Sequence, residues 1–553
     1  MESVSRTKYV TFFFIFVAMV LIIRLFSLQI THGEHYKNLV LEQSGGRPEV
    51  TTERSTIFFT TKSGDKVPAA LTKYGFSVAI NPRNILDPED AYRQISQFLD
   101  TDKEEFLAKA SKEDDPYEII EKRIDYDTGR LLQSKVPFLV HLQPVSWRHY
   151  PHDSLASRVI GFTGQTASDP VVRGRYGIER EFDSKLSFLR RSEQNFLSFL
   201  GTSMYSIPTQ DQHRTISLTI EPVIQGNLEE TLLEAQNQYQ AKGAGGIVLD
   251  PKTGQVIAMG YTPRFDPNNL GAFQDQRLFK NPLVESVYEF GSVIKPFIVA
   301  TALEEGSITS NYRYEDEGSI EINEDITIWN YDKRGRGEVG LQEILGQSLN
   351  TGMVDIITRT EPTRIKTAFE KAGATQKTQI TLPNEANNLT NSLNNQSEVD
   401  FASLSFGQSI ALTPISAAAS LASLANHGQS VTPSITPIEL KNTGKQVFSR
   451  NTTQEITRLL IDATKENFAD SHAIVNTLPI AAKTGTAQIA KPGGGGYFTD
   501  RNLHTMIGYF PAQDPEFFML LYLEEPKGAR YAASTMAKPF FETIEFIANY
   551  YQL

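Results

Sequence analysis

Three short motifs follow one another in the second half of this chain, and they constrain its fold because they must meet in space to act together. They are Ser292-Val293-Ile294-Lys295, Ser348-Leu349-Asn350 and Lys483-Thr484-Gly485-Thr486. They read as S-x-x-K, S-x-N and K-T-G, a set in which a serine is the nucleophile and a lysine, rather than a histidine, is its base. The fold is therefore expected to bring widely separated segments to one site.

Sequence context has to select these copies, because each motif occurs more than once. Two further S-x-x-K matches, Ser5-Arg6-Thr7-Lys8 and Ser63-Gly64-Asp65-Lys66, lie in charged or turn-like stretches. A second S-x-N match, Ser392-Leu393-Asn394, lies in an asparagine-rich stretch that predicts a solvated loop. A second K-T-G match, Lys252-Thr253-Gly254, lies between two apolar runs that predict a hairpin.

The selected copies lie in segments that predict regular structure. Ser292 opens the apolar run 293–303, which predicts a buried helix, and residues i and i+3 share a helix face, so Ser292 and Lys295 can touch. Ser348 ends a stretch of helical periodicity. Lys483 lies in a predicted strand, in which Gly485 would let a ligand backbone approach closely. The alternative for Ser292 and Lys295 is an N-cap serine followed by a lysine that snorkels to the surface.

Burial would give Lys295 the chemistry of a base. A lysine among apolar side chains loses hydration, which disfavours its charged form and lowers its pKa from about 10.4. A neutral lysine can take the proton of a serine hydroxyl. A second cation nearby, Lys483, would lower the pKa of Lys295 further.

From about Ser217 to its C-terminus, the chain resembles the transpeptidase domain of class B penicillin-binding proteins. Beyond the three motifs, the resemblance rests on Ser217–Glu221 and on 288–292, 406–408, 412–414, 424–428 and 507–511. Upstream, the stretches 148–151, 159–164 and 177–179 resemble the non-catalytic pedestal of that family. The resemblance implies an α/β multidomain chain, in which a mixed α/β pedestal precedes an antiparallel sheet flanked by helices, as in serine β-lactamases.

The resemblance also implies a role for each motif residue. Ser292 would be the nucleophile and Lys295 its base, Ser348 would relay a proton to the leaving amine, and Asn350 would hold both Lys295 and the peptide amide of the substrate. The positive charge of Lys483, with Thr484, Gly485 and Thr486, would bind the terminal carboxylate. Backbone N–H groups of Ser292 and Thr486 would stabilise the oxyanion.

The family implies a substrate and partners. The donor would be a peptidoglycan stem peptide ending in D-alanyl-D-alanine, and β-lactams would mimic it and trap Ser292. No cofactor or metal is implied. A bifunctional relative would carry a glycosyltransferase domain, for which the chain has neither the signature nor the room, so a separate glycan polymerase of the SEDS family is expected as a partner. The stretch 288–296 resembles division-type more than elongation-type sequences.

Three departures from the family pattern stand out. Phe290 replaces a proline and Ala482 replaces a glycine, and both changes are expected to be tolerated. The pedestal stretch 53–64 has lost most of the family's arginine- and glycine-containing pattern, which puts the usual pedestal contacts in doubt.

Length and composition limit the number of domains and the classes of function that the chain can have. With 553 residues the chain has room for two or more domains, and we expect a tail and anchor at 1–30, a pedestal at 31–214 and a transpeptidase domain at 215–553. A net charge of −12 without a basic cluster argues against nucleic acid as a partner. The chain has no cysteine, which excludes disulfides and a thiol nucleophile.

The N-terminal apolar run predicts a membrane anchor. Residues 9–23 are uncharged, and continuing past Arg24 to Ile30 gives the roughly 20 residues that a membrane span needs. Arg6 and Lys8 precede the run, which places the N-terminus in the cytoplasm and the catalytic part outside a single-pass inner membrane span. The alternative, a cleaved signal peptide, is disfavoured because no small-residue cleavage site follows.

Two other functions fit the same motifs. One is a hydrolytic relative, a D,D-carboxypeptidase or β-lactamase, whose acyl-enzyme reacts rapidly with water. The other is a non-catalytic β-lactam sensor or scaffold. The large pedestal and the anchor disfavour the first, and the intact motifs with the short N-terminal tail disfavour the second.

Overall fold

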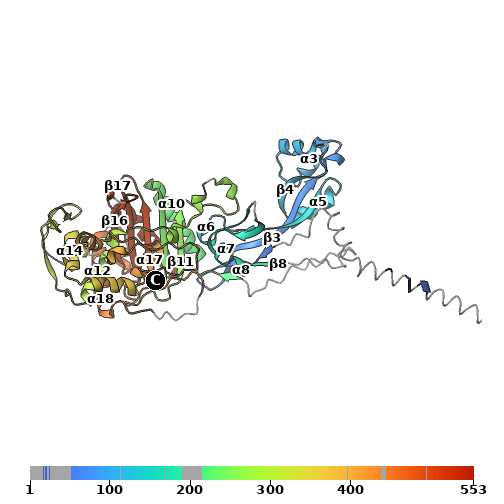
Figure 1. The fold of residues 1–553 in the computed structure, drawn as a ribbon. Helices are drawn as coiled ribbons and strands as arrows, with labels where there is room; N and C mark the ends of the chain where they lie inside the picture. Colours follow the sequence, from blue (N-terminus) through green and yellow to red (C-terminus); the bar gives the residue numbers. More distant parts are fainter. Residues whose placement is uncertain are drawn as a thin grey trace, which may run out of the picture. The chain divides into compact units, whose positions relative to one another are not determined.

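The computed structural model describes residues 16, 17, 19, 20, 24, 52–112, 114–166, 169–189, 215–273, 275–394, 397–437, 444–493 and 495–553 (Figure 1). The chain forms two compact units, residues 1–53 with 188–209 and residues 54–187 with 210–553. The candidate site lies in the second unit. The predicted boundary at 214/215 stays a prediction.

The predicted anchor at residues 9–30 lies almost entirely outside the described residues. Among the helices that the structure describes, none combines the length and the apolar character that a membrane crossing needs.

An antiparallel sheet of five strands forms the centre of the C-terminal region, in the order β11–β10–β18–β17–β16. This confirms the antiparallel sheet predicted beside the K-T-G strand, and it places that strand, β16, at the edge of the sheet. The strands are β10 (Gly243–Leu249), β11 (Val256–Thr262), β16 (Ala481–Ala490), β17 (Tyr497–Phe510) and β18 (Phe517–Glu524).

Helices cover both faces of this sheet. On β18, Met519 and Leu521 pack with α10 (Pro222–Gln238) and α20 (Ala532–Tyr551), whereas Leu520 packs with the helices of the opposite face. Successive strand residues point to opposite faces, so a strand buried on both sides is apolar throughout. This explains why every residue of β18 is buried.

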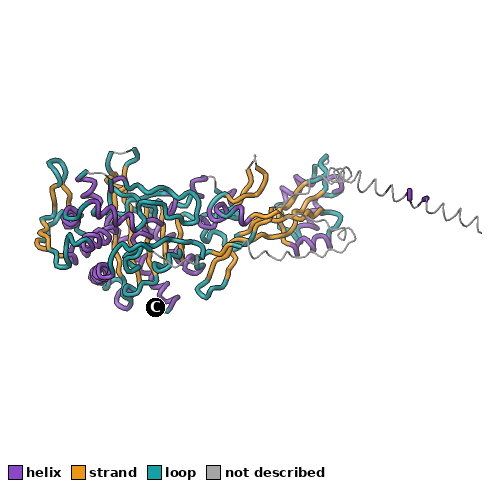
Figure 2. The backbone as a smooth tube through the Cα atoms, turned by 60° about the horizontal axis from the view of Figure 1, so that its bottom comes forward, coloured by secondary structure: helices purple, strands orange, loops and turns teal. Residues whose placement is uncertain are grey.

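The opposite face is covered by a layer of short helices and hairpins that carries two of the three motifs. Figure 2 shows that most helices gather in this C-terminal region, whereas strands make up much of the pedestal. The helices are α11 (Pro282–Glu285), α12 (Lys295–Glu304), α13 (Leu341–Gly346), α14 (Asn350–Thr358), α15 (Pro362–Lys371), α16 (Glu398–Leu404), α17 (Pro414–Leu421) and α18 (Arg450–Phe468). Helix α19 (Ile474–Thr477) packs instead with α20 on the first face. The hairpin strands are β12 (Arg313–Asp316), β13 (Ser319–Glu321), β14 (Thr327–Trp329) and β15 (Gly337–Gly340).

Capping residues fix where several of these helices begin. Thr413 accepts a hydrogen bond from the Ser416 N–H at the start of α17, and Ser449 does the same for Thr452 at the start of α18. A side-chain oxygen at this position satisfies an N–H group that has no partner within the helix.

The pedestal is built on a second sheet, which contains both parallel and antiparallel pairs. Its strand order is β4–β3–β2–β9, and β5 also pairs with β3. Strand β9 belongs to the segment that opens the C-terminal region and pairs in parallel with β2, so the two regions share this sheet. Its strands are β2 (Ile57–Thr60), β3 (Lys66–Ile80), β4 (Glu118–Asp125), β5 (His141–His149) and β9 (Ile216–Ser217). The remaining pedestal elements are β1 (Thr52–Arg54), α3 (Pro88–Ile95), α4 (Lys103–Ala110), α5 (Tyr126–Lys135), α6 (Ser157–Ile160), β6 (Thr163–Thr166), β7 (Asp169–Gly174), α7 (Gly177–Glu181), α8 (Asp183–Leu186) and β8 (Ser187–Leu189).

The altered stretch 53–64 still supplies one buried ionic contact to the pedestal. Glu179 is fully buried between Arg54 and Arg148, whose nearest guanidinium nitrogens lie 2.7 and 2.6 Å from its carboxylate oxygens. Arg54 also pairs with Asp183. A buried carboxylate needs such partners, because removing one would leave an uncompensated charge.

Candidate active site

Ser292 lies in a tight turn at the start of a buried helix. The 3-10 turn Gly291–Ile294 runs directly into α12, whose residues from Lys295 to Ala302 are all buried. The predicted buried helix is therefore confirmed. Gly291 has a φ of +66°, a conformation that glycine adopts without strain, and its N–H donates to the Gly407 carbonyl at 3.2 Å.

The turn that carries Ser292 packs against the K-T-G strand. A methyl group at Gly291 would lie 3.1 Å from the Thr486 carbonyl, and one at Gly485 would lie 2.5 Å from the Phe290 carbonyl. The predicted approach of a ligand backbone to Gly485 stays a prediction, because these contacts concern only the direction in which a Cβ would point. The space beside its Cα is filled by the Phe290 carbonyl and the Thr505 hydroxyl, which lets the nucleophile turn approach the strand.

Lys295 lies at the centre of the three motifs. Its side chain is fully buried, and Nζ contacts the Ser348 carbonyl at 2.7 Å, Asn350 Oδ1 at 2.8 Å and Ser348 Oγ at 3.2 Å. Burial holds the pKa of Lys295 well below its usual range, and the nearby charge of Lys483 lowers that pKa further. The structure therefore brings the S-x-x-K and S-x-N motifs together around a lysine whose burial disfavours its charged form.

The contacts of Lys295 leave its lone pair for a hydroxyl group. A neutral amine has two N–H bonds and one lone pair. The Ser348 carbonyl and Asn350 Oδ1 can only accept hydrogen bonds, so together they occupy both N–H bonds. Asn350 Nδ2 donates to the Trp329 carbonyl at 3.0 Å, which fixes the orientation of this amide. The remaining lone pair can accept a hydroxyl proton, which is what a base for a serine nucleophile must do.

Lys483 lies on β16, as the sequence predicts. Its side chain is 5% exposed, and burial lowers its pKa to about 7. Its Nζ donates to the Thr484 carbonyl at 3.1 Å. Thr484 and Thr486 are half-buried on the same strand, and the Thr486 hydroxyl accepts a hydrogen bond from the Ala532 N–H at 3.0 Å. The roles assigned to these three residues in substrate binding stay predictions.

Three of the rejected motif copies lie in other parts of the fold, whereas Ser5-Arg6-Thr7-Lys8 lies outside the described residues. Lys252-Thr253-Gly254 forms the turn between β10 and β11, which confirms the predicted hairpin. The solvated loop predicted around Ser392 is wrong at that residue, because Ser392 is buried in a short 3-10 turn whose neighbour Leu393 packs into the core. Among the described residues, no group of three or more His, Asp or Glu side chains is arranged to hold a metal ion.

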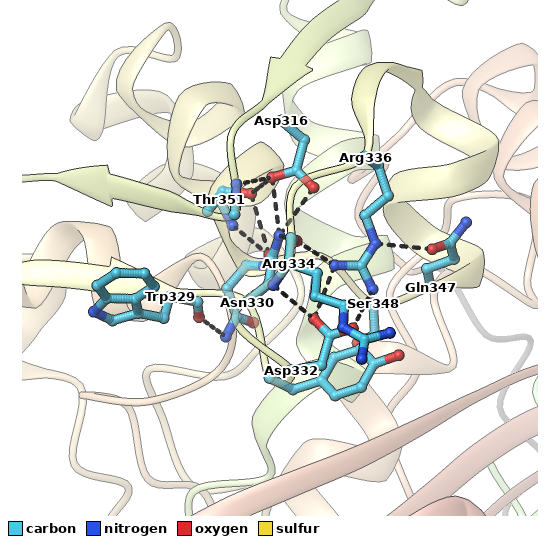
Figure 3. A network of polar contacts seen from close by, with 12 residues as sticks. Asp316, Trp329, Asn330, Asp332, Arg334, Arg336, Gln347, Ser348 and Thr351 are labelled. Atoms are coloured by element: carbon cyan, nitrogen blue, oxygen red, sulfur yellow. Dashed lines mark hydrogen bonds and ion pairs between the residues drawn. The ribbon is translucent and has the colours of Figure 1, made fainter.

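Sequence reasoning missed the residues that support the S-x-N motif from behind. Asn330 Oδ1 accepts hydrogen bonds from the Asn350 and Thr351 N–H groups, and Asn330 is itself bound to the buried Asp316 (Figure 3). The two hairpins between residues 313 and 340 carry these groups, and their short strands and turns have no periodicity that would have marked them.

Two replacements near the motifs are accommodated in the core. The Phe290 ring is buried and packs edge-on against Tyr522, with ring centroids 6.3 Å apart. Ala482 is buried on β16, and its N–H donates to Thr464 Oγ1 at 3.0 Å.

A protein-family model described as "Penicillin binding protein transpeptidase domain" matches residues 244–545, more than half of the chain. This chain belongs to the penicillin-binding protein transpeptidase family. The resemblance found in the sequence is thereby confirmed. The matched region contains all three motifs and the central sheet.

Three known proteins show how far the similarity extends. Stage V sporulation protein D of Bacillus subtilis is 26% identical over 98% of this chain and 84% of its own length. The probable peptidoglycan D,D-transpeptidase PenA of Neisseria meningitidis is 27% identical over 72% of this chain and 67% of its own length. The solved structure of penicillin-binding protein 2X from Streptococcus thermophilus matches with a TM-score of 0.71 at 18% identity, over 90% of this chain and 79% of that one. This last likeness confirms the transpeptidase fold within a mixed α/β, multidomain chain.

Proposed function

We propose that this chain is a peptidoglycan D,D-transpeptidase that works through an acyl-enzyme on Ser292. The observation that carries the proposal is the buried Lys295, whose amine is held by Ser348 and Asn350 and whose pKa is lowered by burial. Membership of the penicillin-binding protein family and the transpeptidase activity named for relatives such as PenA support it.

Acylation begins with attack of Ser292 Oγ on the carbonyl carbon of the penultimate D-alanine. The Ser292 proton passes to Lys295, and the new C–O bond forms a tetrahedral intermediate whose oxyanion is held by backbone N–H groups. Ser348 then relays a proton to the departing nitrogen. The C–N bond breaks, terminal D-alanine leaves as an amine, and an ester on Ser292 remains.

Deacylation completes the cross-link. An amine of a neighbouring stem peptide attacks the ester, loses a proton to the Lys295–Ser348 pair and forms a new amide bond. Ser292 recovers its proton as the leaving alkoxide. Lys483, with Thr484 and Thr486, binds the terminal carboxylate of the donor, so donor binding favours the charged form of Lys483.

A β-lactam follows the same first step. Its strained amide stands for the D-alanyl-D-alanine bond, and its carboxylate stands for the terminal carboxylate. The departing nitrogen stays attached through the opened ring, so it keeps occupying the path that an acceptor amine would use. The Ser292 ester is then long-lived.

The chain acts at the outer face of the cytoplasmic membrane. The apolar segment at residues 9–30 anchors it, and Arg6 and Lys8 keep the short N-terminal tail inside. A separate glycan polymerase of the SEDS family supplies the strands that it cross-links, in a division role. Co-purification of the full-length chain with such a polymerase, lost when residues 9–30 are replaced by an unrelated span, is the expected result.

The enzymatic proposal is tested with a stem pentapeptide ending in D-alanyl-D-alanine and an added acceptor amine. Wild type should release D-alanine and form the cross-linked peptide, and Lys295→Arg should do neither. Release of D-alanine with hydrolysed donor alone would assign a carboxypeptidase. Absence of both products from a folded chain would assign a scaffold.

A further inference from the structure

A buried carboxylate–amide pair lies directly behind the Ser348-Leu349-Asn350 segment. Asp316 is 1% exposed and Asn330 is 2% exposed. Asn330 Nδ2 donates to both carboxylate oxygens of Asp316, at 2.9 and 3.0 Å. Figure 3 shows the two side chains facing one another, with Thr351 beside them.

Asn330 caps helix α14 from a distant part of the chain. The first N–H groups of a helix have no partner within it, and a side chain at the residue before the helix usually accepts from one of them. That residue is Leu349, whose side chain has no oxygen. Asn330 Oδ1 takes its place and accepts from the Asn350 N–H at 2.8 Å and the Thr351 N–H at 3.3 Å.

Asp316 holds this cap in place. Its Oδ1 also accepts from the Thr351 hydroxyl at 2.7 Å and from the Gly318 N–H at 3.0 Å. Its backbone carbonyl accepts from the Arg336 N–H at 2.9 Å. The carboxylate lies at the N-terminal end of α14, where the helix dipole favours a negative charge. Asp316 thus joins the hairpin β12–β15 to the first turn of the helix that begins with Asn350.

The segment held by this pair is bent into an unusual conformation. Ser348 has a φ of +56°, in the left-handed region that costs a non-glycine residue free energy and that persists only where surrounding structure enforces it. On its N-terminal side, Gln347 accepts from Arg336 Nε at 3.1 Å, and Asp332 binds Arg336 through both oxygens. On its C-terminal side, Asn330 holds Asn350. The bend directs the Ser348 carbonyl and Asn350 Oδ1 at Lys295.

We propose that Asp316 and Asn330 are positioning residues for the acylation step. They fix the start of α14, so that the Ser348 carbonyl and Asn350 Oδ1 occupy both N–H bonds of neutral Lys295 and its lone pair faces the hydroxyl groups. This inference rests on the proposed function. It predicts that disturbing the pair slows bond formation at Ser292 by a larger factor than it weakens the initial, noncovalent binding of the ligand, which Asn350 also contacts.

The test exchanges the two members of the pair in the full-length chain. Asn330→Asp places two carboxyl groups where an amide met a carboxylate, and their repulsion is relieved only when the pair binds a proton. Asp316→Asn combined with Asn330→Asp restores one amide and one carboxylate in the opposite order. In this double variant, the new amide oxygen can still accept from Thr351 and Gly318, and its NH2 group can donate across the pair.

Acylation by benzylpenicillin is monitored by intact-mass analysis of samples quenched at successive times. Repeating this at several drug concentrations separates the acylation rate constant from the noncovalent dissociation constant. For Asn330→Asp at pH 8, the rate constant should fall about ten- to a hundred-fold, the scale of one lost positioning contact. The dissociation constant should change by a smaller factor than the rate constant. The rate constant relative to that of wild type at the same pH should recover as pH falls and the pair takes up a proton, and the double variant should recover it at pH 8.

Asn323→Asp is the matched control. Asn323 Oδ1 also accepts from two backbone N–H groups, those of Asp325 and Ile326, but in the exposed hairpin connection between β13 and β14. This variant should acylate like wild type.

Three results would overturn the inference. They are an unchanged rate constant in Asn330→Asp, a loss that neither acid nor the exchange restores, and an equal loss in Asn323→Asp. If Asn330→Asp does not fold, Thr351→Val removes the hydroxyl contacts to Asp316 and Asn330 and leaves the pair itself in place, and an unchanged rate constant there would overturn the inference equally. A wild-type chain that forms no adduct would instead reject the proposed function itself.

Discussion

Lys295 Nζ and Asn350 Oδ1 lie 2.8 Å apart, although 55 residues separate them in the sequence. This contact joins the helix that follows the nucleophile to the helix that follows the S-x-N turn. It also supplies one of two acceptors that occupy the N–H bonds of a neutral Lys295. The geometry of the site therefore depends on how the chain holds Asn350 as much as on the burial of Lys295.

Two replacements of Lys295 should distinguish the effect of its positive charge from its role as a base. Lys295→Arg keeps a cation and several donors, but its guanidinium does not lose a proton at working pH. Lys295→Met keeps much of the apolar stem and removes the amine. Both should slow benzylpenicillin acylation by about 10²–10⁴-fold, the usual effect of losing a general base. If Lys295→Arg retained the wild-type rate, Lys295 would act as an electrostatic group and not as a base.

Two replacements of Ser348 should distinguish the role of its hydroxyl group in catalysis from the cost of its left-handed backbone conformation. Ser348→Ala and Ser348→Gly both remove Oγ and should slow release of D-alanine to a similar extent. Glycine adopts a φ of +56° freely, so Ser348→Gly should have a free energy of unfolding roughly 0.5–1 kcal/mol above that of Ser348→Ala. Thermal or denaturant unfolding measures this difference. Equal stabilities would show that the bend carries no strain.

Gly485 should tolerate no side chain, because the nucleophile turn fills the space beside it. A Cβ there would lie 2.4 Å from Thr505 Oγ1 and 2.5 Å from the Phe290 carbonyl. Gly485→Ala should destabilise the fold by about 1–3 kcal/mol, as overpacking does, and should slow acylation by displacing the turn. Gly271→Ala is the control, since nothing lies within 4 Å of its added Cβ. Similar losses of stability in the two variants would contradict this account.

Lys295 should limit activity at low pH, and Lys483 should limit it at high pH. Burial and the charge of Lys483 keep the pKa of Lys295 low, so its basic form increases as pH rises through that lowered pKa. Burial lowers the pKa of Lys483 to about 7 in the free enzyme, so the charge that would bind the donor carboxylate is lost as pH rises through that value.

For a carboxylate-bearing donor, kcat/KM reports groups of the free enzyme and should therefore decline above a pH of about 7. Lys483→Arg keeps its charge throughout this range, so the alkaline decline should disappear. A decline that persists unchanged in Lys483→Arg would assign it to another group.

The sequence was sufficient to place the chosen Ser292 and Lys483 motifs on the correct kinds of element. The apolar run after Ser292 predicts the helix that buries Lys295, and the mostly apolar stretch before Lys483 predicts a strand. Both signals are local, because burial and strand pairing leave a pattern in neighbouring residues. The hairpin at Lys252 was predicted from the same kind of signal.

Long-range contacts made between irregular segments could not be predicted. Asp316 and Asn330 lie in short hairpins, and they reach α14 across 35 and 20 residues of chain, respectively. The contact at Gly485 has the same origin, since only the folded chain shows that the Phe290 carbonyl lies where a Cβ of residue 485 would be. Ser392 lies in a polar stretch but is buried because Leu393 draws the turn toward the core.

The most direct test of the account is intact-mass analysis of the full-length chain after exposure to benzylpenicillin, with wild type compared with Ser292→Ala. The account predicts a stable mass increase of one intact drug molecule in wild type and none in Ser292→Ala. An adduct that persists in Ser292→Ala, or drug that is consumed by wild type without an adduct, would contradict it.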